Sequence, residues 1–209
     1  MTNLSQSTPL QISGPLTLEG SVVRLEPIRH EHAELFWDVA HNDLEDIFRW
    51  IPYAVQTRDD FRKLVDKAFD EQQRGESIVF ATVERSSGRA VGSTRFMNID
   101  RVNRRVEIGS TWIAPPWQRT AVNTEAKYLM VRHAFEVWQC IRLELKTDAL
   151  NQKSRNAILR IGAKEEGTLR RHLLTWTGRV RDTVYFSILD NEWPGVRAKL
   201  EARLSPSRP

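Results

Sequence analysis

The 209-residue sequence predicts a single mixed α/β domain around one mostly antiparallel sheet of about seven strands. The clearest observation is a hairpin signal, because strand-like residues 77–84 and 90–99 flank the turn RSSGR. Two helix-like segments precede this hairpin, and strand-like and helix-like segments alternate after it. A chain of this length can build one well-developed core, whereas two ordinary domains would need more residues.

Periodic segments define the remaining elements. Residues 22–28 and 106–113 predict strands, and residues 30–41 and 57–73 predict amphipathic helices. The apolar face of the first helix holds Leu35, Phe36, Val39 and Ala40. In the second half we expect helices at about residues 124–138 and 152–161, and strands at residues 141–147, 164–174 and 179–189.

Composition and the chain ends predict a globular protein that is neither secreted nor membrane-spanning. Hydrophobic residues make up 40% of the chain and charged residues 28%, as in globular proteins. The sequence has no apolar run of about 18 residues, so no membrane span is expected. Residues 1–15 predict a disordered lead without a secretion signal, and hence a cytoplasmic location. We expect the domain at residues 16–203 and a tail at residues 204–209.

Cysteine content and net charge narrow the function classes only in part. Cys140 is the only cysteine, which excludes an intramolecular disulfide and a cysteine-built zinc site. Its place at an apolar helix end favours a small core residue over a nucleophile. The formal net charge of +4 fits a nucleotide-like cofactor, an anionic surface such as the ribosome, or a solvated exterior.

The segment Gln118-Arg119-Thr120-Ala121-Val122-Asn123 is a candidate anion-binding loop. It lies between a strand that ends by Pro115 and a helix expected from about Thr124, where backbone N–H groups and the helix dipole favour negative charge. The small side chains of Thr120 and Ala121 would let a phosphate approach the backbone, and Arg119 adds positive charge. An ordinary strand-to-helix turn fits the same six residues.

Four segments together resemble the GNAT acetyltransferases, in the branch typified by the ribosomal-protein alanine acetyltransferases RimJ and RimL. They are VRLEPI, EIGSTWIAPPWQRTAVNTEAKYLM, LELKTDALNQKSRNAILRIGAKEEGTLR and RDTVYFSILDNEWP, and the resemblance covers roughly residues 16–200. It implies a GNAT fold whose central sheet is splayed in the middle. It also implies transfer of an acetyl group from acetyl-CoA to a primary amine, without a metal, and a possible homodimer.

The resemblance also implies the residues that bind the cofactor. The strands at 106–113 and 141–147 would separate to admit the pantetheine arm, and the loop at 118–123 would hold the pyrophosphate. The residues expected to contact acetyl-CoA are Trp112, Ile113, Gln118, Arg119, Thr120, Ala121, Val122, Asn123, Thr124, Asn151 and Ser154. Where the family usually has the first small residue of this loop, a glycine, the sequence has Ala121, which predicts weaker binding or a shifted loop, without an obvious block.

Glu107 is the candidate general base for the acceptor amine. An α-amino group has a pKa of about 8 and a Lys of about 10.4, so the acceptor must lose a proton before it attacks the thioester. In a regular strand Glu107 shares a face with Gly109 and Thr111, which leave room for a ligand. The alternative is a solvated carboxylate paired with Arg104 or Arg105.

Ser154 is the candidate donor to the leaving thiolate, and Asn151 is expected to contact the pantetheine. The family places an Asn and a Ser or Tyr at these positions. Asn151 fits equally well as the N-cap of the helix at 152–161, with Ser154 in its first turn. No tyrosine lies in residues 151–162, so the acid that many GNAT enzymes use is missing.

Other aromatic residues and histidines are weaker candidates. His133 is expected in the core, while His172 and Tyr185 lie on strands near the expected cleft. The tryptophans at positions 37, 50 and 112 fit either an acceptor pocket or the core.

Two other functions and the identity of the acceptor stay open at this point. The chain fits a catalytically silent acetyl-CoA sensor, because of Ala121, or a basic ribosome-associated module that uses RVNRR and LRRHLLTWTGRVR. The arginines lie at turns, and no aromatic RNA-binding signature accompanies them. The acceptor amine is a protein N-terminus or a small molecule. Asp43, Glu45 and Asp46 fit either a contact to a cationic acceptor or a solvated helix face.

Overall fold

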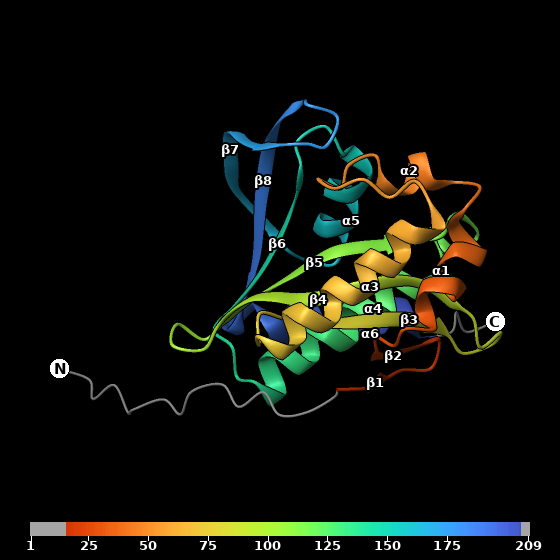
Figure 1. The fold of residues 1–209 in the computed structure, drawn as a ribbon. Helices are drawn as coiled ribbons and strands as arrows, with labels where there is room; N and C mark the ends of the chain where they lie inside the picture. The colour runs from red at the N-terminus through yellow and green to blue at the C-terminus, as the bar shows by residue number, and fades with distance from the viewer. Residues whose placement is uncertain (1–15, 206–209) are drawn as a thin grey trace.

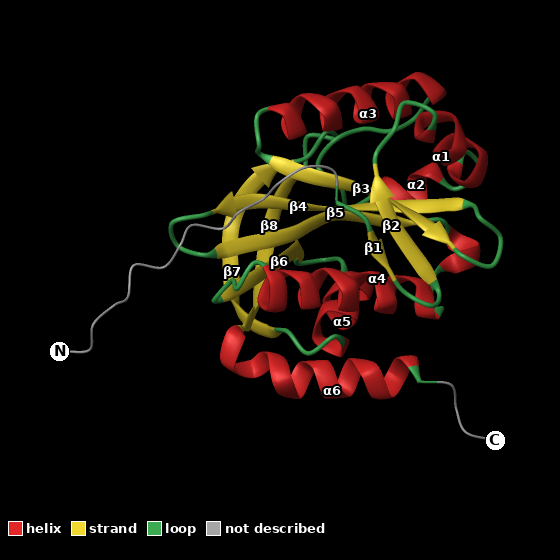
Figure 2. Cartoon of the chain, turned by 90° about the horizontal axis from the view of Figure 1, so that it is seen from below, coloured by secondary structure: helices red, strands yellow, loops and turns green. Residues whose placement is uncertain are grey.

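The computed structural model describes residues 16–205, which form one eight-stranded sheet with helices on both faces (Figures 1 and 2). The predicted lead at residues 1–15 and the tail residues 206–209 lie outside the described residues. Leu204, which we expected in the tail, is the last residue of the final helix. The mixed α/β fold predicted from the sequence is confirmed, with eight strands in place of about seven.

The strands lie in the sheet order β1-β2-β3-β4-β5-β6-β8-β7, and every neighbouring pair is antiparallel except β5 and β6. Their bounds are β1 Leu18–Glu19, β2 Val23–Pro27, β3 Ser77–Glu84, β4 Ala90–Asp100, β5 Arg105–Ile113, β6 Arg142–Asp148, β7 Lys164–Leu174 and β8 Val180–Leu189. The additional strand is β1, which is too short to leave a periodic signal in the sequence.

The helices divide between the two faces of the sheet (Figure 2). Helices α1 (His32–Ala40) and α3 (Arg58–Gln73) cover one face, and α4 (Ala121–Arg132), α5 (Gln152–Arg160) and α6 (Trp193–Leu204) lie on the other. The short α2 (Leu44–Phe48) follows α1, and α4 continues as a π-helical turn at His133–Val137. Our sequence reading did not predict α2 or α6. It also placed Leu35 on the buried face of α1, where 42% of this residue is in fact exposed.

Each face of the sheet has its own apolar core. On the α1 and α3 face, Phe36, Phe48 and Phe61 pack around Trp112, with ring centroids 5.1 to 5.8 Å from that indole. On the other face, buried residues of α4, α5 and α6 pack against the central strands. Together these two cores hold β4 and β5 fixed from both sides, so the site that follows rests on a rigid base.

The sheet divides between β5 and β6, as predicted. The two parallel strands pair only through Arg105 with Arg142, Val106 with Leu143, and Glu107 with Glu144. Beyond these pairs β5 stays with β4, whereas β6 turns away with β8 and β7 (Figure 1). Backbone groups of both strands are therefore available to a ligand in the gap, because neither strand pairs with the other there.

A bulge in β5 corrects one sequence expectation. Ser110 has a φ of +46°, and the pairing with β4 skips from Gly109 opposite Arg95 to Trp112 opposite Ser93. Thr111 therefore faces α4, where its hydroxyl lies 2.5 Å from Lys127 Nζ. The expectation that Thr111 shares a face with Glu107 is wrong, because the extra residue reverses the alternation.

Candidate active site

The start of α4 presents an anion-binding geometry. The helix begins at Ala121, three residues earlier than expected, because Thr120 acts as its N-cap. The Thr120 hydroxyl accepts a hydrogen bond from the Val122 N–H at 3.3 Å and donates to the Trp117 carbonyl at 2.7 Å. The remaining N–H groups of the first turn have no acceptor within the helix, so they are free to bind an anion.

Lys153 adds a cation to this site and was not among the candidates from the sequence. Its Nζ donates to Gln118 Oε1 at 2.5 Å, and Gln118 Nε2 donates to the Ile113 carbonyl at 2.8 Å. Gln118 therefore connects the end of β5 to the first turn of α5. Arg119, exposed and with a φ of +60°, is the second cation next to the start of α4. Lys153 could have been found from its place in the first turn of a helix that follows the diverging strand β6.

Ala121 does not disturb the loop. It is exposed and has no positive φ, whereas the neighbouring Arg119 does, so the backbone at position 121 does not require a glycine. Asn123 Oδ1 is buried and has no hydrogen-bond partner among the described residues, as expected of a group that waits for a ligand. Thr124 is half-buried on the same helical turn.

Three of the expected cofactor contacts are restricted to the backbone. The side chains of Trp112, Ile113 and Val122 are buried in the two apolar cores, with 6%, 7% and 1% of each residue exposed. Trp112 is therefore a core residue, and it does not line an acceptor pocket. Only the main chain of these three positions can contact a ligand between β5 and β6.

The first turn of α5 follows β6 on the other side of the gap. Asn151 Oδ1 accepts a hydrogen bond from the Ser154 N–H at 3.0 Å, which is N-cap geometry. Ser154 is half-buried. Asn151 therefore has the structural role that we left open, and its side-chain amide keeps its donors for another partner.

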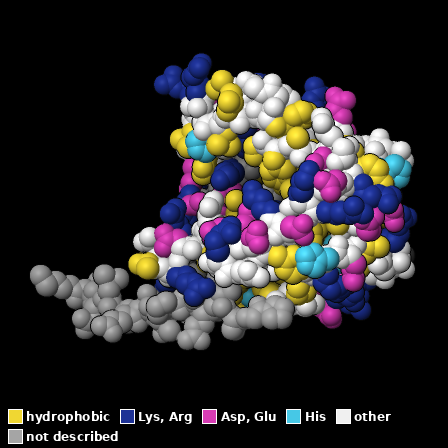
Figure 3. Space-filling model, viewed as in Figure 1, with side chains coloured by type: hydrophobic (Ala, Val, Ile, Leu, Met, Phe, Trp, Pro, Cys, Tyr) yellow, Lys and Arg dark blue, Asp and Glu magenta, His cyan; other side chains and the backbone are white. Residues whose placement is uncertain are grey.

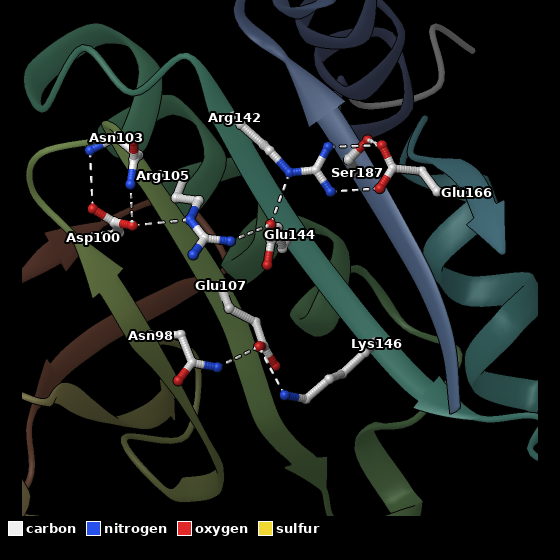
Figure 4. Close-up of polar contacts among 10 residues, drawn as sticks. All are labelled: Asn98, Asp100, Asn103, Arg105, Glu107, Arg142, Glu144, Lys146, Glu166 and Ser187. Carbon is white, nitrogen blue, oxygen red and sulfur yellow. Dashed lines mark hydrogen bonds and ion pairs between the residues drawn. The ribbon is translucent and has the colours of Figure 1, made fainter. Parts of the chain in front are cut away.

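Glu107 lies where β5 and β6 begin to separate, and only 2% of it is exposed. Its Oε2 accepts a hydrogen bond from Asn98 Nδ2 at 2.7 Å and forms an ion pair with Lys146 Nζ at 2.9 Å (Figure 4). Its Oε1 is buried without a partner among the described residues. A Cβ at position 109 would lie 3.1 Å from that oxygen, so Gly109 keeps the space beside it open.

The solvated alternative for Glu107 is wrong. Arg105 pairs instead with Asp100 at 3.2 Å and with Glu144 at 3.4 Å (Figure 4). Arg104 donates to the Gln139 carbonyl. Lys146 on β6 is the actual partner of Glu107. Its side chain is only 23% exposed, because it lies between Glu107 on β5 and the Tyr185 ring on β8.

An open cavity of about 810 Å³ adjoins Glu107. Its lining combines β4, β5, β6 and β8 residues, among them Asn98, Arg105, Glu107, Glu144 and Tyr185. In the space-filling view, acidic and basic side chains lie together around a hollow on this side of the molecule (Figure 3). A polar molecule can therefore enter from solvent and lie next to the Glu107 side chain.

A charged network closes the base of the gap. Arg142 donates to Glu144 at 2.8 Å and binds both oxygens of Glu166, and Ser187 donates to Glu166 at 2.7 Å (Figure 4). The Arg142 guanidinium lowers the pKa of Glu166 to about 2. The network ties β6, β7 and β8 together below Glu107.

Comparison with known proteins agrees with this geometry. Residues 23–164 match the model of the Acetyltransferase (GNAT) domain. This chain belongs to the GNAT acetyltransferase family. A GCN5-related N-acetyltransferase from Brucella melitensis is 33% identical, with a TM-score of 0.89 over 96% of this chain and 90% of that one. RimJ of Mycobacterium smegmatis, solved with CoA-disulfide, is 25% identical, with a TM-score of 0.76 over 91% of this chain and 93% of that one.

A curated GNAT relative is YdaF of Bacillus subtilis, which carries the provisional name of a ribosomal N-acetyltransferase. It is 37% identical over 110 residues, which are 53% of this chain and 59% of YdaF. The match therefore spans less than two thirds of that relative. The resemblance to the RimJ/RimL branch is confirmed by these matches.

Of the remaining candidates, two lie in or next to the core and two lie on β7 and β8. Cys140 is 1% exposed, and burial raises its pKa to about 11, so it is the core residue we expected. His133 is half-buried and packs on Trp138, which lowers its pKa by desolvation. His172 on β7 and Tyr185 on β8 lie together, with ring centroids 5.9 Å apart.

Two tryptophans with different surroundings remain from the predicted pocket. Trp37 packs on α1 and α3 beside Phe61, away from Glu107. Trp50, which precedes β3 in the chain, lies next to β8, where its carbonyl accepts from Arg181 at 3.3 Å. Of these two tryptophans, only Trp50 therefore lies beside β8.

Within residues 16–205, no group of three or more His, Cys, Asp and Glu side chains is arranged to hold a metal ion. No helix in that range is long and apolar enough to cross a membrane.

Proposed function

We propose that this chain transfers an acetyl group from acetyl-CoA to a primary amine by direct attack within a ternary complex. The observation that carries the proposal is the buried Glu107, with one free oxygen, at the point where β5 and β6 separate. The same proposal treats residues 16–203 as one acetyltransferase domain that needs no metal. Acetyl-CoA supplies the activated acetyl thioester.

The residues around the start of α4 fit the cofactor. Free N–H groups of the first helical turn would bind the pyrophosphate, with Arg119 and Lys153 beside them. Backbone groups of β5 at Trp112 and Ile113 would bind the pantetheine amides. Asn123 Oδ1 and the amide donors of Asn151 would hydrogen-bond the same arm.

Glu107 is proposed to accept the proton of the acceptor amine. Its Oε2 is already engaged by Asn98 and Lys146, which hold the carboxylate in one orientation. Its Oε1 remains for the amine, directly or through a water. Ser154 is proposed to donate to the leaving thiolate, because it is half-buried in the first turn of α5 and no tyrosine lies in residues 151–162.

The acceptor is proposed to be a protein N-terminal α-amine or a small-molecule amine, in a cytoplasmic enzyme that forms a homodimer. The name of YdaF refers to ribosomal acetylation, which favours a protein acceptor here as well. The RNA-binding alternative is less favoured, because Arg104 and Arg105 of the RVNRR segment are engaged with Gln139, Asp100 and Glu144.

The test is release of free CoA thiol in the presence of amine acceptors, compared between the wild type and Glu107→Gln. We expect the variant to lose about 10²- to 10⁴-fold in kcat/KM, the usual contribution of a general base. Binding of acetyl-CoA, measured by calorimetry, should be unchanged, because Glu107 faces the acceptor cavity. The buried Cys140 should add little background to the thiol reading.

Ser87→Ala, on an exposed turn, serves as the matched control and should keep full activity. If Glu107→Gln transfers acetyl groups at the wild-type rate, Glu107 is not the base. A wild type that binds acetyl-CoA and acetylates no amine would favour the sensor alternative.

A further inference from the structure

Strands β5, β7 and β8, on either side of the gap between β5 and β6, carry buried polar atoms that lack partners. Among residues 16–205, four of these atoms belong to strands on either side of the gap: Glu107 Oε1 on β5, His172 Nδ1 on β7, and Arg181 Nε and Thr183 Oγ1 on β8. A buried polar atom without a hydrogen bond is costly in a folded protein, so a group of them indicates a ligand site.

These residues share one face of the sheet. Arg181, Thr183 and Tyr185 alternate along β8 and therefore point to the same side. Tyr185 packs against His172, and Lys146 Nζ, which binds Glu107, lies 5.8 Å from the centre of the Tyr185 ring. Lys146 thus connects Glu107 to Tyr185, and Arg181 lies farther along the same face of β8.

Arg181 has donors to spare. It is only 4% exposed, and its one hydrogen bond is from Nη1 to the Trp50 carbonyl at 3.3 Å. Its Nε lies 3.9 Å from Asp148 Oδ2, beyond hydrogen-bond distance. Asp148 does not depend on it, because Arg179 binds Oδ2 and the Leu150 N–H donates to Oδ1 at 3.0 Å.

The Arg181 guanidinium is buried among charged side chains. Desolvation lowers its pKa, and the negative charges of Asp148 and Glu107 and the Tyr185 side chain oppose that shift. A guanidinium in such surroundings gains most from a ligand oxygen, which would complete its hydrogen bonds.

We propose that Arg181, with Thr183 beside it, binds an oxygen of the acceptor, so that the site selects primary amines that carry a nearby carbonyl or carboxylate. This inference rests on the proposed function, because it assigns the amine to Glu107 and the oxygen to Arg181. An N-terminal amino acid residue has both groups, as does a free amino acid. A simple alkylamine or a polyamine has no oxygen to offer.

The chemistry favours recognition of this kind. A site with buried donors discriminates strongly against an analogue that lacks the matching acceptor, since its own polar groups are then left unpaired. Arg181 becomes a specificity-determining residue, whereas Glu107 handles the proton. The two roles are separable in kinetics.

The test compares alaninamide with isopropylamine as acceptors for the wild type and for Arg181→Met. We expect the variant to lose about 10- to 100-fold in kcat/KM with alaninamide, mainly through KM, and less than about 3-fold with isopropylamine. The kcat/KM of the variant is divided by that of the wild type for each acceptor separately, so the effect of the different pKa values of the two amines cancels.

Three further variants keep the test decisive. Thr183→Val removes one hydroxyl at constant shape and should lower kcat/KM with alaninamide by a few-fold. Arg181→Lys should lower this kcat/KM less than Arg181→Met does. Arg170→Met, an exposed residue of β7, should leave kcat/KM with both acceptors unchanged. If Arg181→Met fails to fold in a melting experiment, the Thr183 and Lys variants carry the comparison alone.

The outcomes separate this inference from the proposed function. Equal losses with both acceptors, or none, would overturn the role of Arg181 while leaving acetyl transfer intact. A wild type that acetylates neither amine, nor alanine, nor an alanyl peptide would refute the proposed function itself. Assays with alanine and with an alanyl peptide as acceptors distinguish a carboxylate partner of Arg181 from a peptide carbonyl. A larger loss of kcat/KM with either of them than with isopropylamine supports the inference.

Discussion

Lys127 on α4 is a charged residue in an apolar setting. It is 6% exposed, and its Nζ donates to Thr111 Oγ1 at 2.5 Å and to Thr94 Oγ1 at 3.1 Å, both on strands above the helix. Neither partner carries a charge. Desolvation therefore lowers the pKa of Lys127 from 10.5 to about 7.

The lowered pKa predicts how stability depends on pH. Between pH 7 and 10.5 the unfolded chain holds a proton on Lys127 that the folded chain has released, so the free energy of unfolding rises with pH in this window. The contribution is at most about 1.4 kcal/mol per pH unit. Below pH 7 the folded protein must bury the charged form, and the destabilisation is complete.

Lys127→Met should therefore be more stable than the wild type at pH 7, and the difference should shrink toward pH 10. Urea denaturation of both proteins at several pH values measures it. A difference that stays constant from pH 7 to 10 would show that Lys127 is charged in the folded protein. The Thr94 and Thr111 hydroxyls, 2.7 Å apart, can satisfy each other in the variant.

Among the secondary-structure elements, the start of α4 is the proposed binding site of the cofactor pyrophosphate. Ala121 stands at the first helical position with its side chain exposed, and the positive φ falls on Arg119. The methyl group that we expected to weaken binding therefore points away from the helix interior and requires no unusual backbone conformation.

Ala121→Gly should not tighten acetyl-CoA binding by more than about 3-fold, and it should lower stability by about 0.5 to 1 kcal/mol, since glycine is the poorer helix former. Calorimetric titration and thermal melting measure the two effects. A gain of tenfold or more in affinity would mean that the methyl group obstructs the phosphate after all.

Local signals in the sequence were sufficient for most elements. Residues 77–84 form a mostly apolar run that is followed by a turn containing Gly88, and β3 has the predicted bounds. The bulge at Ser110 leaves no such signal, because a positive φ on serine is set by packing on both faces of β5. Helix α6 could have been predicted, since Pro194 lies in its first turn, where proline is common.

Across the whole chain, the proposed active site unites segments that are distant in sequence. Glu107 comes from β5 and its partner Lys146 from β6, while Trp50 reaches β8 from the segment before α3. The sequence predicted Glu107 through its strand and the family resemblance. It could not predict Lys146 or Arg181, because their roles depend on which strands separate and which neighbours remain paired.

Melting of the purified protein with and without acetyl-CoA tests most directly whether the gap between β5 and β6 and the start of α4 form the cofactor site. At about 100 times the dissociation constant, binding adds roughly 2.7 kcal/mol, which should raise the melting temperature by about 5 to 10 °C. Acetyl-pantetheine, which lacks the pyrophosphate, should raise it much less at the same concentration. An equal rise with both compounds, or no rise with acetyl-CoA, would contradict the account.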